Sequence, residues 1–228
     1  FFAVPSLNAG ILDEVSSVSE KSDIYMYINM QNLISFLKQK GINIKDLDEL
    51  AADNSGKDDN KALTDFGIKL SDIREVFFAG YTEDFEKKGG FIVFVTVNDN
   101  KAKIPESAKL NSVKINGISF FEANTEAGIL FSLLNNTFIA GPKEYIEAYF
   151  EKKKSKTKIL SEAAKVFRKN SENKTIYLNL SVSDYLRNEM EKAYTQGALI
   201  SRGLRENVFL KTLLNLKSVD YGIHLSDR

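Results

Sequence analysis

The sequence predicts an α+β protein in which an antiparallel sheet packs against helices, with an internal duplication whose second copy is incomplete. Strand-like apolar runs alternate with turn signals along the middle of the chain. Apolar residues at three- and four-residue spacing indicate amphipathic helices beside them. The stretch TIYLNLSVSDYL at 175–186 also resembles DIYMYINMQNLI at 23–34, which indicates a repeated unit.

The two similar stretches each predict a strand that runs directly into a helix. Ile24 aligns with Ile176 without a gap, and a capping residue follows each apolar run. Ser181, with Asp184 three residues later, fits a helix start, and Asn29 is a looser version of the same cap.

A second pair of anchors follows at a different offset. Val76 aligns with Val219 and Phe78 with Tyr221, so the offset falls from 152 to 143. The polar stretch DNSGKDDNK at 53–61 has nine residues, and one loop insertion there explains the difference. The alternative is coincidence, because strand-to-helix junctions share a limited capping chemistry.

The middle of the chain predicts five or six antiparallel strands. The runs at 74–81 and 89–97 are strand-like. Asn116 and Gly117 lie between two β-rich runs, which is a strong hairpin signal. The stretch 128–141 predicts another hairpin that turns at asparagines 135 and 136.

Two helices and a final strand complete the expected order. Pro142 suits the first turn of a helix that continues through KEYIEAYFEKKK, and a second helix is expected at 159–168. The run 219–228 reads as the first strand of a hairpin, so we expect the native chain to continue; otherwise this strand pairs with the first sheet or lies exposed at an edge.

These elements divide the chain into three parts. Residues 1–21 form an N-terminal segment that we expect to be helical. Residues 22–172 form the first strand-helix-sheet unit with two trailing helices, and residues 173–228 form the second, truncated copy. The chain begins FFAVPSL without a Met, so we expect that a signal peptide or lipid-anchor segment has been removed.

Composition excludes several classes of function. Thirty-one basic and thirty-one acidic residues cancel, which argues against nucleic acid as a partner. Cysteine is absent and His224 is the single histidine, so cysteine and multi-histidine metal sites are excluded within one chain. No apolar run approaches the roughly 18 residues of a membrane helix.

Catalytic chemistry finds little support in the sequence. His224 would be the only base for a serine nucleophile, and no GxSxG motif accompanies it. The acidic clusters around Asp46 and Asp58 lie in polar surroundings, and 53–61 lacks the closing glutamate of a calcium loop. We therefore expect no enzyme activity, no catalytic or metal-binding residues and no cofactor.

Two binding surfaces have some support. The lysine-rich run EKKKSKTK at 151–158 could contact phosphates, although lysines also favour a helix C-terminus. The chain has sixteen Phe and nine Tyr, which a core would bury. A curved sheet could instead enclose a hydrophobic ligand, lined by Phe77, Phe91, Phe94, Phe120, Phe121 and Phe131.

The stretches SDIYMYINMQNLISFL and NTFIAGPKEYIEAYFEKKKSKTKILSEAAKVF resemble a group of bacterial cell-envelope proteins and lipoproteins of unknown function that have duplicated strand-helix-sheet units. The resemblance implies an envelope location, periplasmic or at the surface, and a non-enzymatic role. We accordingly expect a scaffold or protein-interaction domain whose partner is another envelope component. The alternative is a carrier for a lipid or another hydrophobic ligand.

Overall fold

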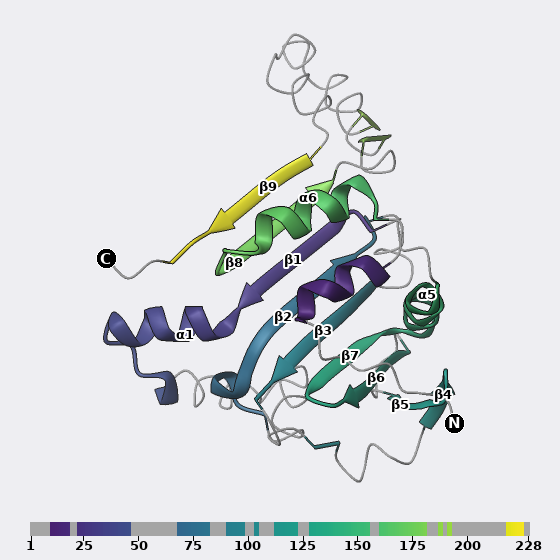
Figure 1. The fold of residues 1–228 in the computed structure, drawn as a ribbon, viewed down its shortest axis with the longest axis horizontal. Coiled ribbons are helices and arrows are strands. Elements are labelled where there is room, and N and C mark those ends of the chain that lie inside the picture. The colour runs from purple at the N-terminus through teal and green to yellow at the C-terminus, as the bar shows by residue number, and fades with distance from the viewer. Residues whose placement is uncertain are drawn as a thin grey trace.

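A computed structural model shows a single antiparallel sheet with helices against it (Figure 1), which confirms the predicted α+β class. The residues that the structure describes are 10–18, 22–46, 68–82, 90–98, 103–104, 112–122, 128–155, 160–181, 187–188, 191–192 and 218–225.

The described elements are strands and short helices, with a run of consecutive strands in the middle of the chain. The strands are β1 (Ile24–Asn29), β2 (Ile73–Gly80), β3 (Phe91–Val97), β4 (Ser112–Ile115), β5 (Ile118–Glu122), β6 (Ile129–Leu134), β7 (Thr137–Pro142), β8 (Ile176–Ser181) and β9 (Ser218–Ile223). The helices are the 3₁₀ helices η1 (Ile11–Ser17) and η4 (Leu70–Asp72), and the α-helices α1 (Met30–Gln39), α5 (Lys143–Lys154) and α6 (Glu162–Ser171).

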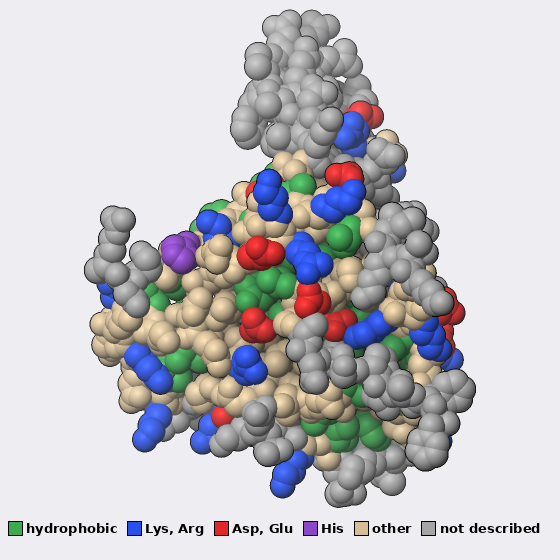
Figure 2. Space-filling view, in the orientation of Figure 1, with side chains coloured by type: hydrophobic (Ala, Val, Ile, Leu, Met, Phe, Trp, Pro, Cys, Tyr) green, Lys and Arg blue, Asp and Glu red, His purple; other side chains and the backbone are tan. Residues whose placement is uncertain are grey.

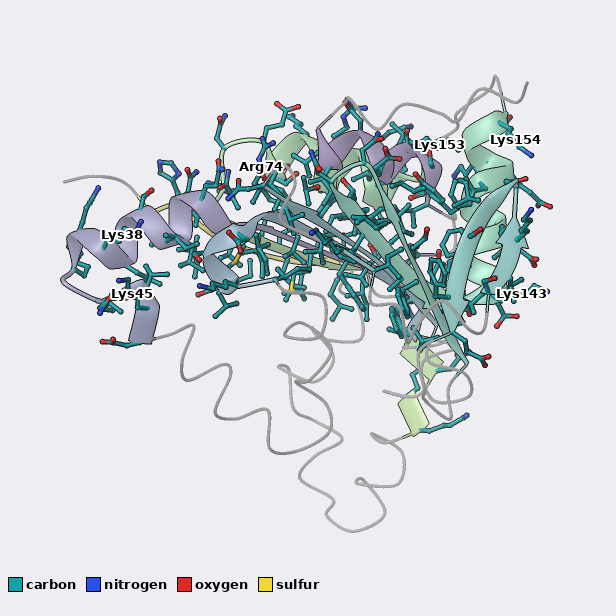
Figure 3. All side chains as sticks on the ribbon, turned by 90° about the horizontal axis from the view of Figure 1, so that it is seen from below. Lys38, Lys45, Arg74, Lys143, Lys153 and Lys154 are labelled. Carbon is teal, nitrogen blue, oxygen red and sulfur yellow. The ribbon has the colours of Figure 1, made fainter. Side chains whose placement is uncertain are left out.

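The strands lie in the order β4-β5-β6-β7-β3-β2-β1-β8-β9, and every described pairing is antiparallel. Helices η1, α5 and α6 lie along one side of this sheet (Figures 1 and 3). The main core fills the space between these helices and the strands. At its centre Phe77 stacks on Phe94 with ring centroids 5.7 Å apart, and Phe167 of α6 packs on Phe77 at the same separation.

The predicted turns and one predicted cap are present. Asn116 and Gly117 connect β4 to β5 with φ of 53° and 80°, the left-handed conformation that a two-residue hairpin requires. Asn135, with φ of 54°, begins the turn between β6 and β7. Asn29 accepts a hydrogen bond from the amide of Asn32 at 3.0 Å and caps α1.

Two helix starts differ from the sequence prediction. Pro142 ends strand β7 and is the N-cap of α5, one residue before the position expected for it. The second helix begins at Glu162 rather than near 159, because the side chain of Ser161 accepts a hydrogen bond from the Ala164 amide at 3.1 Å. The helix therefore starts where the Ser161 side chain caps it. The apolar spacing had predicted an earlier start.

Helix η1 is fastened to α5 and α6 by charged side chains. Glu14 is buried, and its carboxylate accepts hydrogen bonds from the Tyr149 hydroxyl at 2.6 Å and the Lys153 ammonium at 2.9 Å. Asp13 accepts a bond from Arg168 of α6 at 2.6 Å. Residues 11–17 of the predicted N-terminal segment are thus a 3₁₀ helix that closes one side of the core.

Strands from both predicted units adjoin near the β9 edge of the sheet. Met26 of β1 lies opposite Leu178 of β8, its partner in the sequence alignment. Met26 also lies opposite Phe78, as Leu178 lies opposite Tyr221. These registers are the ones that a two-fold axis between β1 and β8 would produce. The duplication itself stays a prediction, because the helix expected after β8 and the loop at 53–61 lie largely outside the described residues.

Candidate functional site: the second face of the sheet

The sheet has a second face, opposite the one that η1, α5 and α6 cover. Strand alternation places every other side chain there. Across five strands the registers align apolar residues in three rows. The rows are Phe91, Gly80, Ile24, Leu180, Val219; Val93, Phe78, Met26, Leu178, Tyr221; and Val95, Val76, Ile28, Ile176, Ile223.

The exposure of these rows is greatest at β8 and β9. A small second core around Ile73, Val97 and Phe138 buries one end of the face. At the other end Leu178, Val219 and Tyr221 are 37%, 46% and 58% exposed. We call these three residues the β9 patch. Large apolar side chains rarely stay in water together unless they bind something, so this patch is the candidate functional site.

A polar cluster supports the patch from the helix-covered side. The Tyr177 hydroxyl donates to the Asp220 carboxylate at 2.6 Å, and the Asn179 amide donates to the same oxygen at 2.7 Å. Asn170 of α6 donates to the Tyr177 hydroxyl at 3.1 Å. Burial raises the pKa of Tyr177 to about 12, and its bond to Asp220 adds to the shift. Hydrogen bonds therefore fix β9 to β8 and α6.

Comparisons with known proteins give only distant similarities. No family model and no curated protein matches the chain. Crystal forms I, III and IV of the Treponema protein TP0453 match with TM-scores of 0.41, 0.42 and 0.38 and sequence identities of 14%, 12% and 12%. The matches cover 74%, 78% and 76% of this chain, which spans 62%, 66% and 67% of the length of TP0453.

The six phenylalanines predicted to line a ligand site lie on both faces of the sheet. Phe77, Phe94 and Phe120 are fully buried on the helix-covered face. The other three lie on the second face, where Phe91 stacks on Phe78 at 5.9 Å and Phe121 packs on Phe131 at the same distance. The six therefore do not line one common space.

The lysines of the 151–158 run contact their own chain. Lys152 donates to the Val18 carbonyl at 2.9 Å, Lys153 to Glu14, and Lys154 to the Asn116 side chain. Lys153 and Lys154 lie at the end of α5, far from Lys38 and Lys45 (Figure 3). Acidic and basic side chains are interspersed on the helix-covered side (Figure 2). The described lysines of the run therefore help to hold α5 in place.

Two of the residues considered for catalysis lie in the described part of the chain. His224 follows β9 and is exposed, and Asp46 accepts a hydrogen bond from Asn43. Asp58 and the loop at 53–61 lie outside the described residues. Within the described part of the chain, no group of three potential ligands could hold a metal ion, and no helix is long and apolar enough to cross a membrane.

Sequence reasoning missed the polar cluster and the β9 patch. The alignment of Val76 with Val219 and Phe78 with Tyr221 contained the signal, because it also places Asp220 where the first unit has Phe77. A carboxylate in place of a core phenylalanine indicates that the helix-covered side is less completely apolar at β9. It gives no reason, however, for the apolar residues on the second face to stay exposed.

Proposed function

We propose that this chain is a non-catalytic interaction domain of a bacterial cell envelope, and that the second face of its sheet binds an apolar surface of another protein. The observation that carries the proposal is the β9 patch. Its three side chains continue the apolar rows of the sheet directly, and they are among the most exposed large hydrophobic residues described.

The chemistry of the patch suits a protein partner. Interfaces are enriched in tyrosine at the centre of the contact and depleted of charge there. Tyr221 lies between Val219 and Ile223 on the same face, and Leu178 lies opposite it. A partner that covers these residues removes apolar area from water. This burial stabilises the complex by about 25 cal/mol per Å².

The envelope location and the non-catalytic role are parts of the same proposal. They are supported by the sequence resemblance described above and by the balanced charge of the chain. Cell fractionation with an antibody against the chain tests the location. A panel of ester, peptide and phosphate substrates tests the absence of catalysis, and turnover above that of a control protein would contradict it.

Site-specific photocrosslinking in the source cells tests the binding surface. A photoreactive phenylalanine analogue at Tyr221 should capture a polypeptide other than this chain. The same analogue at Val166, which is 38% exposed on α6, is the matched control and should capture much less. Equal capture at the two positions, or none at Tyr221, would contradict the proposal.

A triple substitution separates the patch from apolar exposure in general. Serine at Leu178, Val219 and Tyr221 should abolish partner capture in a pull-down with the purified chain. Serine at the large apolar residues that are exposed elsewhere in the described part of the chain should leave capture unchanged; these are Ile42, Val113 and Val166, at 41%, 37% and 38% exposure. The two variants remove the same number of exposed hydrophobic side chains.

A hydrophobic small molecule is the second candidate for the same face. The partly exposed pair of Phe78 with Phe91 on this face favours it, since sites for hydrophobic ligands are lined mainly by hydrophobic and aromatic side chains. A native mass spectrum of the protein purified gently from its source distinguishes the two. A lipid-sized added mass favours the carrier, whereas a second polypeptide favours the interaction domain.

A further inference from the structure

The two outermost strands of the described sheet differ in how well their edges are protected. Strand β4 has four residues and carries the exposed Lys114, and both features discourage pairing with another strand. Strand β9 has six residues and contains no lysine, proline or described bulge. Its one charged residue, Asp220, is bound to Tyr177 and Asn179 of its own chain.

Hydrogen bonds at β8 show which backbone groups of β9 point outward. The Ser181 amide at the end of β8 donates to the Asp23 carbonyl at 2.7 Å. The Asn29 amide donates to the carbonyl of Thr175, just before β8, at 2.7 Å, whereas the Thr175 amide donates to the Ile223 carbonyl of β9 at 2.9 Å. The odd-numbered residues of β8 therefore bond to β1, and its even-numbered residues bond to β9. Those residues lie opposite Val219, Tyr221 and Ile223. The amides and carbonyls of Ser218, Asp220 and Gly222 consequently point to the outer edge.

We infer that the outer edge of β9 pairs with the same edge of a second copy of this chain, antiparallel and centred on Tyr221. In this register Asp220 lies opposite Gly222 of the other copy, and both residues present the outward backbone groups that such a pair requires. Tyr221 lies opposite itself at a non-hydrogen-bonded position, and Val219 opposite Ile223. A register centred on Asp220 would place two carboxylates together.

Charge complementarity favours a second copy of this chain as the partner of the β9 edge. The Lys174 side chain lies over Gly222, since its Cδ and Cε are 3.5 Å from the position of a Cβ built on that glycine. The inferred register brings Asp220 of one copy opposite Gly222 of the other, and therefore beside its Lys174. In the described structure Lys174 has no ion pair, and one Asp220 oxygen has no hydrogen bond. Two symmetric ion pairs would form.

The apolar rows would continue across the junction. A two-fold axis perpendicular to the sheet keeps the same face of both copies on one side. The row through Leu178 and Tyr221 then passes to Tyr221 and Leu178 of the second copy, and the patch loses its exposed edge. The inference extends the proposed function, because pairing would double the second face. It does not depend on that function, because it concerns the edge of β9.

Single cysteines test the register directly, since the chain has none of its own. On mild oxidation of the full chain, Tyr221→Cys should form a disulfide-linked dimer, because non-hydrogen-bonded partners have Cα atoms about 4.5 Å apart. Val219→Cys is the matched control: it faces Ile223 and should cross-link at least tenfold less. Equal cross-linking at the two positions would overturn the register.

Sedimentation velocity of the full chain over a range of concentrations tests the pairing itself. We expect a monomer–dimer equilibrium that Lys174→Glu shifts at least tenfold towards monomer. Lys143→Glu on α5, far from β9 in Figure 1, makes the same change in net charge and should leave the equilibrium unchanged. A chain that stays monomeric at every concentration overturns the inference. Capture of another protein at Tyr221 by such a monomer would still support the proposed function.

Discussion

The pairs β1–β2 and β8–β9 share a register but differ in what their side chains do. On the helix-covered face the first pair places Tyr27 opposite Phe77, and both are buried in the core. The second pair places Asn179 opposite Asp220 at the corresponding position, and a hydrogen bond joins them. The same backbone arrangement is thus stabilised by apolar packing in one pair and by polar contacts in the other. The second pair is therefore held together without the aromatic packing of the first pair.

Removal of the Phe77 ring from the first pair should cause the largest loss in the free energy of unfolding. Phe77 is fully buried and packs on the rings of Tyr25, Phe94 and Phe167. We expect Phe77→Ala to lower the free energy of unfolding by about 3–5 kcal/mol. Urea denaturation followed by circular dichroism measures the change.

The matched control is Tyr221→Ala, which removes an aromatic ring from the second pair. Because this ring is 58% exposed, we expect a loss below about 1 kcal/mol at low protein concentration. Equal losses for Phe77→Ala and Tyr221→Ala would show that the two pairs are packed alike, and the comparison would fail.

Alkaline pH should weaken both pairs through the aligned residues Tyr25 and Tyr177. Burial raises the pKa of each to about 12, compared with about 10 for an unfolded tyrosine. The stabilisation is complete below pH 10 and is lost as the pH rises through 12. It is at most about 2–3 kcal/mol for Tyr25 and smaller for Tyr177, whose hydroxyl bonds to the exposed Asp220.

The variant Tyr25→Phe/Tyr177→Phe isolates this contribution from the titration of lysines. Its free energy of unfolding should fall less steeply than that of the wild type between pH 10 and pH 12, by about two protons in the slope. Parallel curves for the two proteins would contradict the assignment of raised pKa values to these tyrosines.

The hydrogen bonds that Asp220 of β9 accepts should contribute less to the free energy of unfolding than the aromatic core does. Asp220→Ala leaves the Tyr177 hydroxyl and the Asn179 amide without their shared acceptor. We expect a loss of about 1–3 kcal/mol in the free energy of unfolding. Asp220→Asn keeps a carbonyl acceptor and should lose less. If both variants lost the same amount, the charge rather than the hydrogen bonds would be the stabilising feature.

Local signals in the sequence were enough to predict much of the fold. The hairpin at Asn116 and Gly117 follows from residues that tolerate positive φ, and the cap at Asn29 follows from a single side-chain oxygen. The aligned pairs Met26 with Leu178 and Phe78 with Tyr221 even match the registers of the sheet. Each of these features depends on residues close in the chain or on a repeated pattern.

The candidate site depends on contacts that no local pattern specifies. Alternation within β9 shows that Val219 and Tyr221 share a face, but not that this face stays exposed while the opposite one packs on helices. The six phenylalanines illustrate the same limit. Their alternation along each strand was visible, yet the side of the sheet that η1 and α6 cover, and hence the division into two groups, is a tertiary choice.

The smallest expected change in the free energy of unfolding comes from substitutions at two aligned valines. Val76 packs against the small second core, whereas Val219 is 46% exposed. Threonine keeps the branched shape and adds a hydroxyl, which is costly only where it cannot reach water. In dilute protein we expect Val76→Thr to cost about 1 kcal/mol in the free energy of unfolding and Val219→Thr less than about 0.5 kcal/mol. A larger cost at Val219 would mean that its side chain is covered in solution, and sedimentation of the same variant would show whether the cover is a second copy.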